Sequence, residues 1–127
     1  VISKVSGFKK YIHVDLLEVT LLMEKYMTTV NPELNMEYVP SDNSSSLATG
    51  EYDLLISNHS FSEVGKEKQD DYLQNIVKKC AHGYITYNHV SGYPFYEFLT
   101  KLITLGKSVK VRDEQPQTGG TNKVITW

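Results

Sequence analysis

The chain has 127 residues, of which 40% are hydrophobic and 22% charged, and a formal net charge of −2. This is the composition of a globular protein, long enough for one sizeable core, so we expect a single domain over residues 1–127. The 13 basic residues are scattered among 15 acidic ones. Such a balance does not favour a nucleic acid or an anionic membrane as the partner.

The sequence contains one cysteine, Cys80, which excludes an internal disulfide and a cysteine-based zinc site. The apolar stretches are far shorter than the roughly 18 residues that cross a bilayer, and no signal peptide is recognisable. We therefore expect a cytoplasmic protein. Cys80 itself is expected to be a small apolar residue within a helix.

A strand followed by a helix is predicted near the start of the chain. Residues Tyr11 to Val14 form a β-type run that ends in Asp15, and a helix is expected to start at Leu16. Asn31-Pro32 ends this helix. Its predicted apolar face follows helical spacing and consists of Val19, Leu22, Met23, Tyr26 and Met27.

Two further strands follow, separated by a polar segment. Met36 to Val39 is a short strand closed by Pro40, and Ser41 to Gly50 has the composition of a loop. The run from Tyr52 to Ser57 is nearly continuous and apolar. That pattern is typical of a strand buried on both faces of a parallel sheet.

The second half repeats the alternation. Gly83 to Tyr87 is a predicted strand, and Pro94 and Gly106 lie at the start and end of a predicted helix. The apolar face of the helix before this strand consists of Tyr72, Leu73, Ile76, Val77 and Cys80. The face of the helix after it consists of Phe95, Phe98, Leu99, Leu102 and Ile103.

The tail has two β-type runs, Ser108 to Val111 and Lys123 to Trp127, on either side of a turn at Gln115 to Asn122. These runs are expected to form an antiparallel hairpin. The whole order is β-α-β-loop-β-α-β-α-β-β. Such alternation predicts an α/β fold with a mostly parallel sheet, covered by helices on both faces, and a C-terminal antiparallel hairpin.

Polar residues follow each predicted strand of the parallel part. They are Asp15; Ser41, Asp42 and Asn43; Asn58 to Glu63; and Asn88 with His89. Open parallel sheets bind ligands beyond the carboxyl ends of their strands, so a binding site is predicted among these residues. No spacing of histidines and carboxylates demands a metal.

Asp15 has two possible roles at this stage. A carboxylate at the end of an early strand can accept both hydroxyls of a ribose. Aspartate is also a good N-cap for a helix that starts at Leu16.

His59 and Glu63 also have two interpretations each. His59 can take a proton from a hydroxyl near neutral pH, and Glu63 can orient it or act as the base itself. Alternatively, His59 is a loop histidine bonded to the backbone, and Glu63 forms a capping box with Ser60 at the start of the next helix.

Three segments together resemble a known family. They are Tyr11 to Glu18, with Asp-Leu-Leu-Glu; Tyr52 to Glu63, with Ser-Asn-His-Ser-Phe-Ser-Glu; and Cys80 to Asn88. They are similar, in order and spacing, to motifs of class I S-adenosylmethionine-dependent methyltransferases, and most similar to bacterial sugar O-methyltransferases. This resemblance implies a three-layer Rossmann-like fold and O-methyl transfer, with S-adenosylmethionine as the cofactor and a small molecule, a sugar, as the acceptor.

The resemblance also implies roles for individual residues. Asp15, with Leu16 beside it, would hold the cofactor's ribose, and Ser41 and Asp42 would lie along the adenine. Asn58 would flank the methyl donor. His59 would be the catalytic base with Glu63 as its partner.

One part of the family pattern is missing. The first strand and its Gly-x-Gly loop have no counterpart, and Val1 to Ser6 resembles the last turns of the helix that follows that loop. We therefore expect the C-terminal part of a methyltransferase domain, lacking the first strand and active only in the full-length protein. The alternative is a non-catalytic α/β binding or scaffold module derived from such an enzyme. Leu17 in place of the usual proline is expected to affect only the helix start.

Overall fold

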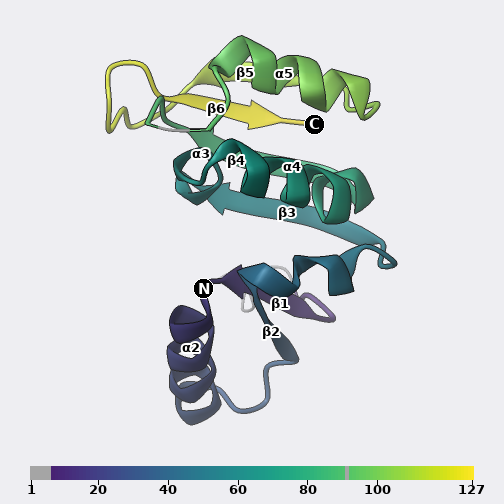
Figure 1. The fold of residues 1–127 in the computed structure, drawn as a ribbon. Helices are drawn as coiled ribbons and strands as arrows, with labels where there is room; N and C mark the ends of the chain where they lie inside the picture. Colours follow the sequence, from purple (N-terminus) through teal and green to yellow (C-terminus); the bar gives the residue numbers. More distant parts are fainter. Residues whose placement is uncertain (1–6, 91) are drawn as a thin grey trace. The chain divides into compact units, whose positions relative to one another are not determined.

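A computed structural model describes residues 7–90 and 92–127. The segment Val1 to Ser6, expected to be helical, lies outside the described residues. The chain forms two compact units, Val1–Ser45 and Ser46–Trp127. The secondary-structure elements of both are labelled in Figure 1.

The first unit is a βαβ unit. Strand β1 (Tyr11–Asp15) is followed by helix α2 (Leu17–Val30) and strand β2 (Met36–Pro40). The two strands pair in parallel, from Tyr11 opposite Met36 to Asp15 opposite Pro40. The sequence prediction of strand, helix and strand is confirmed. The segment after β2, predicted as a loop, contains the 3₁₀ helix η1 (Ser41–Leu47).

Helix α2 has apolar residues on more of its circumference than its own strands cover. Thr20 is buried and Met23 and Met27 are half-buried, whereas Leu22 and Tyr26 are exposed. The predicted apolar face is therefore only partly buried among the described residues. Two strands are too narrow to cover a stripe that extends around so much of the helix.

The second unit contains a four-stranded sheet in the order β3-β4-β6-β5. Strands β3 (Tyr52–Asn58) and β4 (Cys80–Tyr87) pair in parallel. Strands β5 (Lys110–Asp113) and β6 (Lys123–Thr126) form an antiparallel hairpin, and β6 also runs antiparallel to β4. The C-terminal hairpin predicted from the sequence is confirmed.

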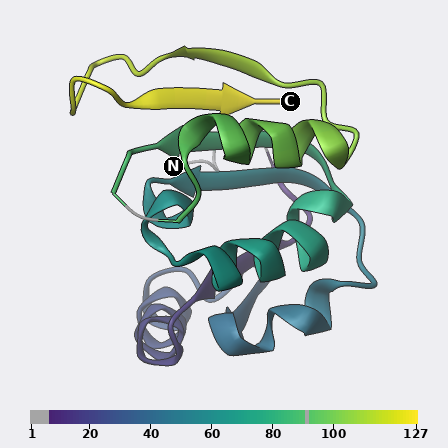
Figure 2. The ribbon, with the colours of Figure 1, turned by 45° about the horizontal axis from the view of Figure 1, so that its top comes forward.

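Helices pack on one face of this sheet. They are α3 (Ser60–Glu63), α4 (Lys66–Asn75) and α5 (Phe95–Thr104), with a 3₁₀ turn η2 (Val77–Lys79) after α4. Ile85 and Tyr87 are alternate residues of β4 and therefore lie on the same face. They belong to one buried cluster with Ile125 of β6 and with Phe61, Leu73, Phe98 and Leu102 of the helices. The course of these helices and of the sheet can be followed in the ribbon of Figure 2.

The opposite face of this sheet is more open. Leu54 and Ile56 of β3 are 55% and 40% exposed, and β3 pairs only with β4 among the described residues. The expectation that β3 is buried on both faces is thus wrong for the part of the chain that the structure describes. The apolar pattern of an interior strand is present at a sheet edge.

Cys80 is buried, but not in a helix as predicted. Helix α4 ends at Asn75, and Cys80 is the first residue of β4. Its thiol donates to the carbonyl of Ile76. Burial raises the pKa of Cys80 to about 11, so the thiol is protonated and unreactive at neutral pH.

A buried glutamine joins the helices to the segment after β4. The side-chain amide of Gln69 donates to the carbonyl of Phe61 (2.8 Å), and its Oε1 accepts from the backbone N–H of Tyr93 (2.9 Å). Gly92 lies directly against Gln69 and has a φ of +74°, and a Cβ at this position would overlap the glutamine amide. Glycine is required here for both its conformation and its size.

We expect Gly92→Ala to lower the free energy of unfolding by about 2 to 4 kcal/mol, because it adds backbone strain and displaces a buried hydrogen-bonding group. Gly120→Ala is the matched control, since a Cβ at Gly120 meets open space. Urea unfolding of both variants tests this, and equal effects would contradict the role assigned to the Gly92–Gln69 contact.

Candidate functional site

The carboxyl ends of β3 and β4 lie together because the two strands are parallel. Asn58, the last residue of β3, is opposite Thr86, and Asn88 follows the end of β4 by one residue. The polar residues predicted after these two strands are therefore brought to one edge of the sheet. The candidate site of the second unit is built around His59.

His59 makes a tight turn between β3 and α3. Its φ is 65° and its ψ −37°, the only positive φ of a non-glycine residue that the structure describes. Its backbone N–H donates to the carbonyl and the hydroxyl oxygen of Thr86, both at 3.0 Å. A non-glycine residue in this conformation is strained by about 1–3 kcal/mol and is held only by strong surrounding contacts.

Ser57 and Ser62 help to hold this turn. The Ser57 hydroxyl accepts from the N–H of Phe61. The buried Ser62 hydroxyl lies within hydrogen-bonding distance of the His59 carbonyl (2.8 Å) and of Asn88 Oδ1 (2.7 Å). The turn after β3 and the residue after β4 are thus bonded to each other.

Glu63 and Asn88 are paired. Asn88 Nδ2 donates to Glu63 Oε1 at 2.7 Å. The residue at the N-cap of α3 is His59, without a side-chain capping bond, so Ser60 is not the N-cap that a capping box requires. In the second unit, Glu63 orients the side chain of Asn88.

The carboxylate against His59 is Glu114, which the sequence did not suggest. His59 Nε2 lies 3.3 Å from Glu114 Oε1, and the Glu114 side chain is only 9% exposed. Glu114 immediately follows β5, one residue before the turn at Gln115 to Asn122 that the sequence predicts, and the sequence prediction gave it no role. No local pattern relates it to His59, because the two meet only when β5, β6 and β4 pair.

Glu114 is surrounded by hydrogen-bond donors. Its Oε2 accepts from the hydroxyl and the backbone N–H of Thr118, at 2.7 and 3.0 Å, and from Asn122 Nδ2 at 3.0 Å. The Thr118 side-chain bond, the Thr118 backbone bond and the Asn122 bond together lower the pKa of Glu114 to about 2, with a smaller contribution from His59. Glu114 is therefore an anion at neutral pH.

The other ring nitrogen of His59 is unpaired among the residues that the structure describes. His59 Nδ1 is buried and makes no hydrogen bond to any residue that the structure describes. An unpaired buried polar atom costs about 1–3 kcal/mol. Such atoms are uncommon in native proteins and call for an explanation.

Tyr93, in the segment after β4, is bonded to helix α4 through the carboxylate of Asp70. The Tyr93 hydroxyl donates to Asp70 Oδ2 (2.6 Å), and the Lys101 ammonium donates to Asp70 Oδ1 (2.9 Å). The hydrogen bond from Tyr93, followed by that from Lys101, lowers the pKa of Asp70. This cluster, with Gln69, keeps the segment that starts at Asn88 in place.

In the first unit, Asp15 lies at the carboxyl end of β1, as predicted, and its side chain is 42% exposed. Its Oδ1 accepts from the N–H of Leu16 (2.8 Å), and its Oδ2 is 3.8 Å from His13 Nε2. The N-cap of α2 is Leu16, without a side-chain capping bond. The capping role considered for Asp15 is therefore wrong.

The remaining predicted cofactor residues of the first unit differ in exposure. Leu16 is exposed, at 60%. Ser41 is buried and Asp42 exposed, and both belong to the first turn of η1. Asn58, in the second unit, is exposed at the end of β3.

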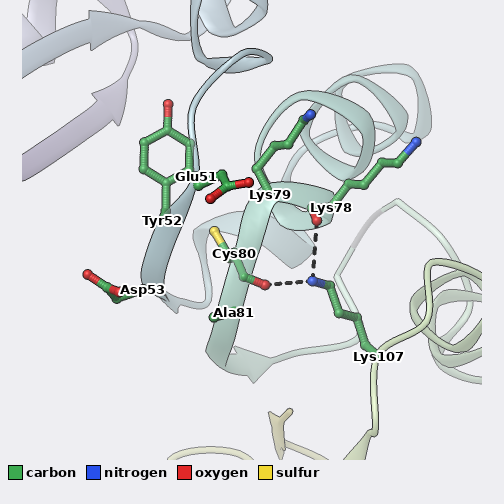
Figure 3. Close-up of a pocket in the computed structure, with 8 residues that line it drawn as sticks. All are labelled: Glu51, Tyr52, Asp53, Lys78, Lys79, Cys80, Ala81 and Lys107. Carbon is green, nitrogen blue, oxygen red and sulfur yellow. Dashed lines mark hydrogen bonds between the residues drawn. The ribbon is translucent and has the colours of Figure 1, made fainter.

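A hollow of about 640 Å³ lies at the opposite end of β3 and β4 from His59 (Figure 3). It is lined by Glu51, Tyr52, Asp53, Lys78, Lys79, Cys80, Ala81 and Lys107. The Lys107 ammonium donates to the carbonyls of Cys80 and Lys78. Its ammonium group is therefore bonded to backbone carbonyls of η2 and the start of β4. The hollow lies at the amino ends of the strands, whereas open parallel sheets bind ligands at the carboxyl ends.

Residues 7–90 and 92–127, which the structure describes, lack both a metal-binding cluster and a membrane-spanning helix. They contain no group of three or more histidine, cysteine and acidic side chains arranged to hold a metal ion. They also contain no helix with the length and apolar character needed to cross a membrane.

No family model and no curated protein matches this sequence, but solved structures do. The structure described as PigF with SAH is 14% identical, with a TM-score of 0.64, and the match covers 98% of this chain and 50% of that one. A "putative O-methyltransferase" from Nostoc punctiforme PCC 73102 is 10% identical, with a TM-score of 0.69, and the match covers 98% of this chain and 46% of that one.

These similarities establish the fold. The chain has a Rossmann-like α/β fold of the kind found in these two structures, as the sequence resemblance implied. It spans about half the length of each of them.

The charge of Glu114 predicts how stability depends on pH. The folded-state pKa of Glu114, about 2, is below the ordinary value of 4.5. The ionised carboxylate therefore contributes fully to the free energy of unfolding above about pH 4.5, and this contribution is lost as the pH falls toward 2. In urea unfolding at a series of pH values, the stability difference between the wild type and Glu114→Gln should shrink over this range. A difference that stays constant would contradict the assignment.

Proposed function

We propose that the chain is part of an enzyme that transfers a methyl group from S-adenosylmethionine to a hydroxyl of a small molecule, with a sugar as the acceptor class. The observation that carries this proposal is His59, a strained histidine at the carboxyl ends of two parallel strands, with one ring nitrogen to which no described residue bonds. A fold like that of PigF with SAH, the product of S-adenosylmethionine, supports the choice of methyl donor.

Asp15 is the residue to which we assign the cofactor's ribose. Its carboxylate is half-exposed at the carboxyl end of β1 and is not used to cap α2. A carboxylate in this position can accept two neighbouring hydroxyls. We assign Leu16, Ser41 and Asp42 to the same cofactor, and Asn58 to its reactive end.

His59 is the residue to which we assign proton removal from the acceptor hydroxyl. When bound, the cofactor supplies an activated methyl group on a sulfonium centre. The protein then has to place the hydroxyl in line and take up its proton, which a histidine can do near neutral pH. Glu63 supports the site by holding Asn88.

We attribute the activity to the full-length protein, because the chain spans about half of both similar structures. The absence of other cysteines besides Cys80 and the ordinary charge balance are consistent with a cytoplasmic enzyme that acts on small molecules. Methyl transfer that depends on His59 would distinguish such an enzyme from a non-catalytic binding module.

Asp15→Ala in the full-length protein should weaken S-adenosylmethionine binding at least about tenfold, because it removes a charged acceptor of hydrogen bonds from the ribose. Isothermal titration calorimetry measures this. Glu18→Ala is the control, since Glu18 is another exposed acidic residue three positions along the chain. Unchanged affinity in Asp15→Ala would remove Asp15 from the site.

His59→Ala should lower turnover by roughly 10²- to 10⁴-fold, the usual contribution of a general base, and should leave cofactor affinity nearly unchanged. The readout is transfer of a labelled methyl group from S-adenosylmethionine to a panel of monosaccharides, beside calorimetry on the same variant. An undiminished rate would show that His59 is not the base.

A further inference from the structure

We propose that Glu114 is the positioning residue of His59. Its carboxylate holds the protonated Nε2 of the imidazole, so that Nδ1 carries the lone pair that accepts a proton. Only the source of that proton, an acceptor hydroxyl, rests on the function proposed above. The pairing and the tautomer follow from the residues of the second unit alone.

The first argument is the charge that faces Nε2. Glu114 Oε1 lies 3.3 Å from His59 Nε2, and Glu114 is ionised at neutral pH. In a neutral imidazole one nitrogen carries the hydrogen and the other a lone pair. A lone pair on Nε2 would lie 3.3 Å from an anion, whereas an N–H there is attracted to it. The hydrogen therefore belongs on Nε2.

The second argument is that Glu114 cannot turn away. Its other oxygen, Oε2, accepts three hydrogen bonds, two from Thr118 and one from Asn122. The Thr118 donors and the Asn122 donor come from the β5–β6 turn, so this turn holds the carboxylate through Oε2. Oε1 is left for His59.

The third argument is the state of Nδ1. With the hydrogen on Nε2, Nδ1 is an acceptor, and it is buried without a donor among the described residues. The same residue has a strained backbone, with φ at 65°. The strained backbone and the unpaired buried nitrogen both cost stability at this one residue, which points to a role in function rather than in folding. A hydroxyl donor from a bound molecule would satisfy Nδ1.

The proposed step balances as follows. The hydroxyl oxygen forms a bond to the methyl carbon as the carbon–sulfur bond breaks, and the sulfur leaves uncharged. The hydroxyl proton goes to His59 Nδ1, which gives an imidazolium whose Nε2–H still faces Glu114. Glu114 stabilises this cation and does not itself take the proton.

Glu114→Gln provides a sharp test, because the donors around Oε2 dictate how the new amide is oriented. The Thr118 N–H and the Asn122 amide require an acceptor, so the glutamine oxygen must face them. Its NH₂ group then faces His59 Nε2, which must become the acceptor. The variant is thus expected to move the imidazole hydrogen from Nε2 to Nδ1 while the loop stays folded.

The tautomer can be read directly by long-range ¹H–¹⁵N NMR of the ¹⁵N-labelled protein at mildly alkaline pH, with the His59 signals assigned by their loss in His59→Gln. Wild type should show a protonated Nε2 and an unprotonated Nδ1, and Glu114→Gln should show the reverse. Asp113→Asn is the matched control. It removes the neighbouring carboxylate, which pairs with Lys123 at the surface, and should keep the wild-type tautomer.

A protonated Nδ1 in the wild type would overturn the proposal, and so would the same tautomer in the wild type and Glu114→Gln. In the full-length protein, Glu114→Gln should lower kcat for methyl transfer by roughly 10²-fold or more, with the KM for S-adenosylmethionine unchanged. If the wild type transfers no methyl group, the proposed function fails, yet the NMR result still decides the pairing.

Discussion

The parallel pairing of β3 and β4 is the constraint on which the rest of the second unit depends. Because Asn58 is opposite Thr86, the turn at His59 comes to lie beside the residues that follow β4. Thr86 then accepts a hydrogen bond from the His59 N–H, and the Ser62 hydroxyl forms a hydrogen bond with Asn88. A change of register by one residue would turn Ile85 and Tyr87 out of the buried cluster and separate the turn from its partners.

The antiparallel hairpin completes the site from a distant part of the chain. Strand β6 pairs with β4 and β5 with β6, and this order brings the residue after β5 to the carboxyl end of β4. Glu114 reaches His59 by this route. The hairpin is thus more than an edge to the sheet, because its turn also supplies the donors that keep Glu114 ionised.

Most elements could be predicted from the sequence, because each depends on local pattern. The strand ending at Asp15, the helix between Pro94 and Gly106 and the final hairpin all depend on periodicity and on turn residues. The errors have a common physical cause. The exposure of Leu54 and the pairing of Glu114 with His59 depend on which strands are neighbours, which no local pattern contains. The roles of Asp15, His59 and Glu63 remain predictions from the family resemblance.

The arrangement around His59 also explains how its strain is tolerated. The backbone of the turn is held by Thr86 on one side and by Ser62 on the other, and the ring is held by Glu114. Each contact comes from a different element, so no single side chain sets the conformation. Rigid support of this kind keeps a reactive group in place without reorganisation when its partner arrives. Nδ1 is the ring nitrogen of His59 that this support leaves buried without a partner among the described residues.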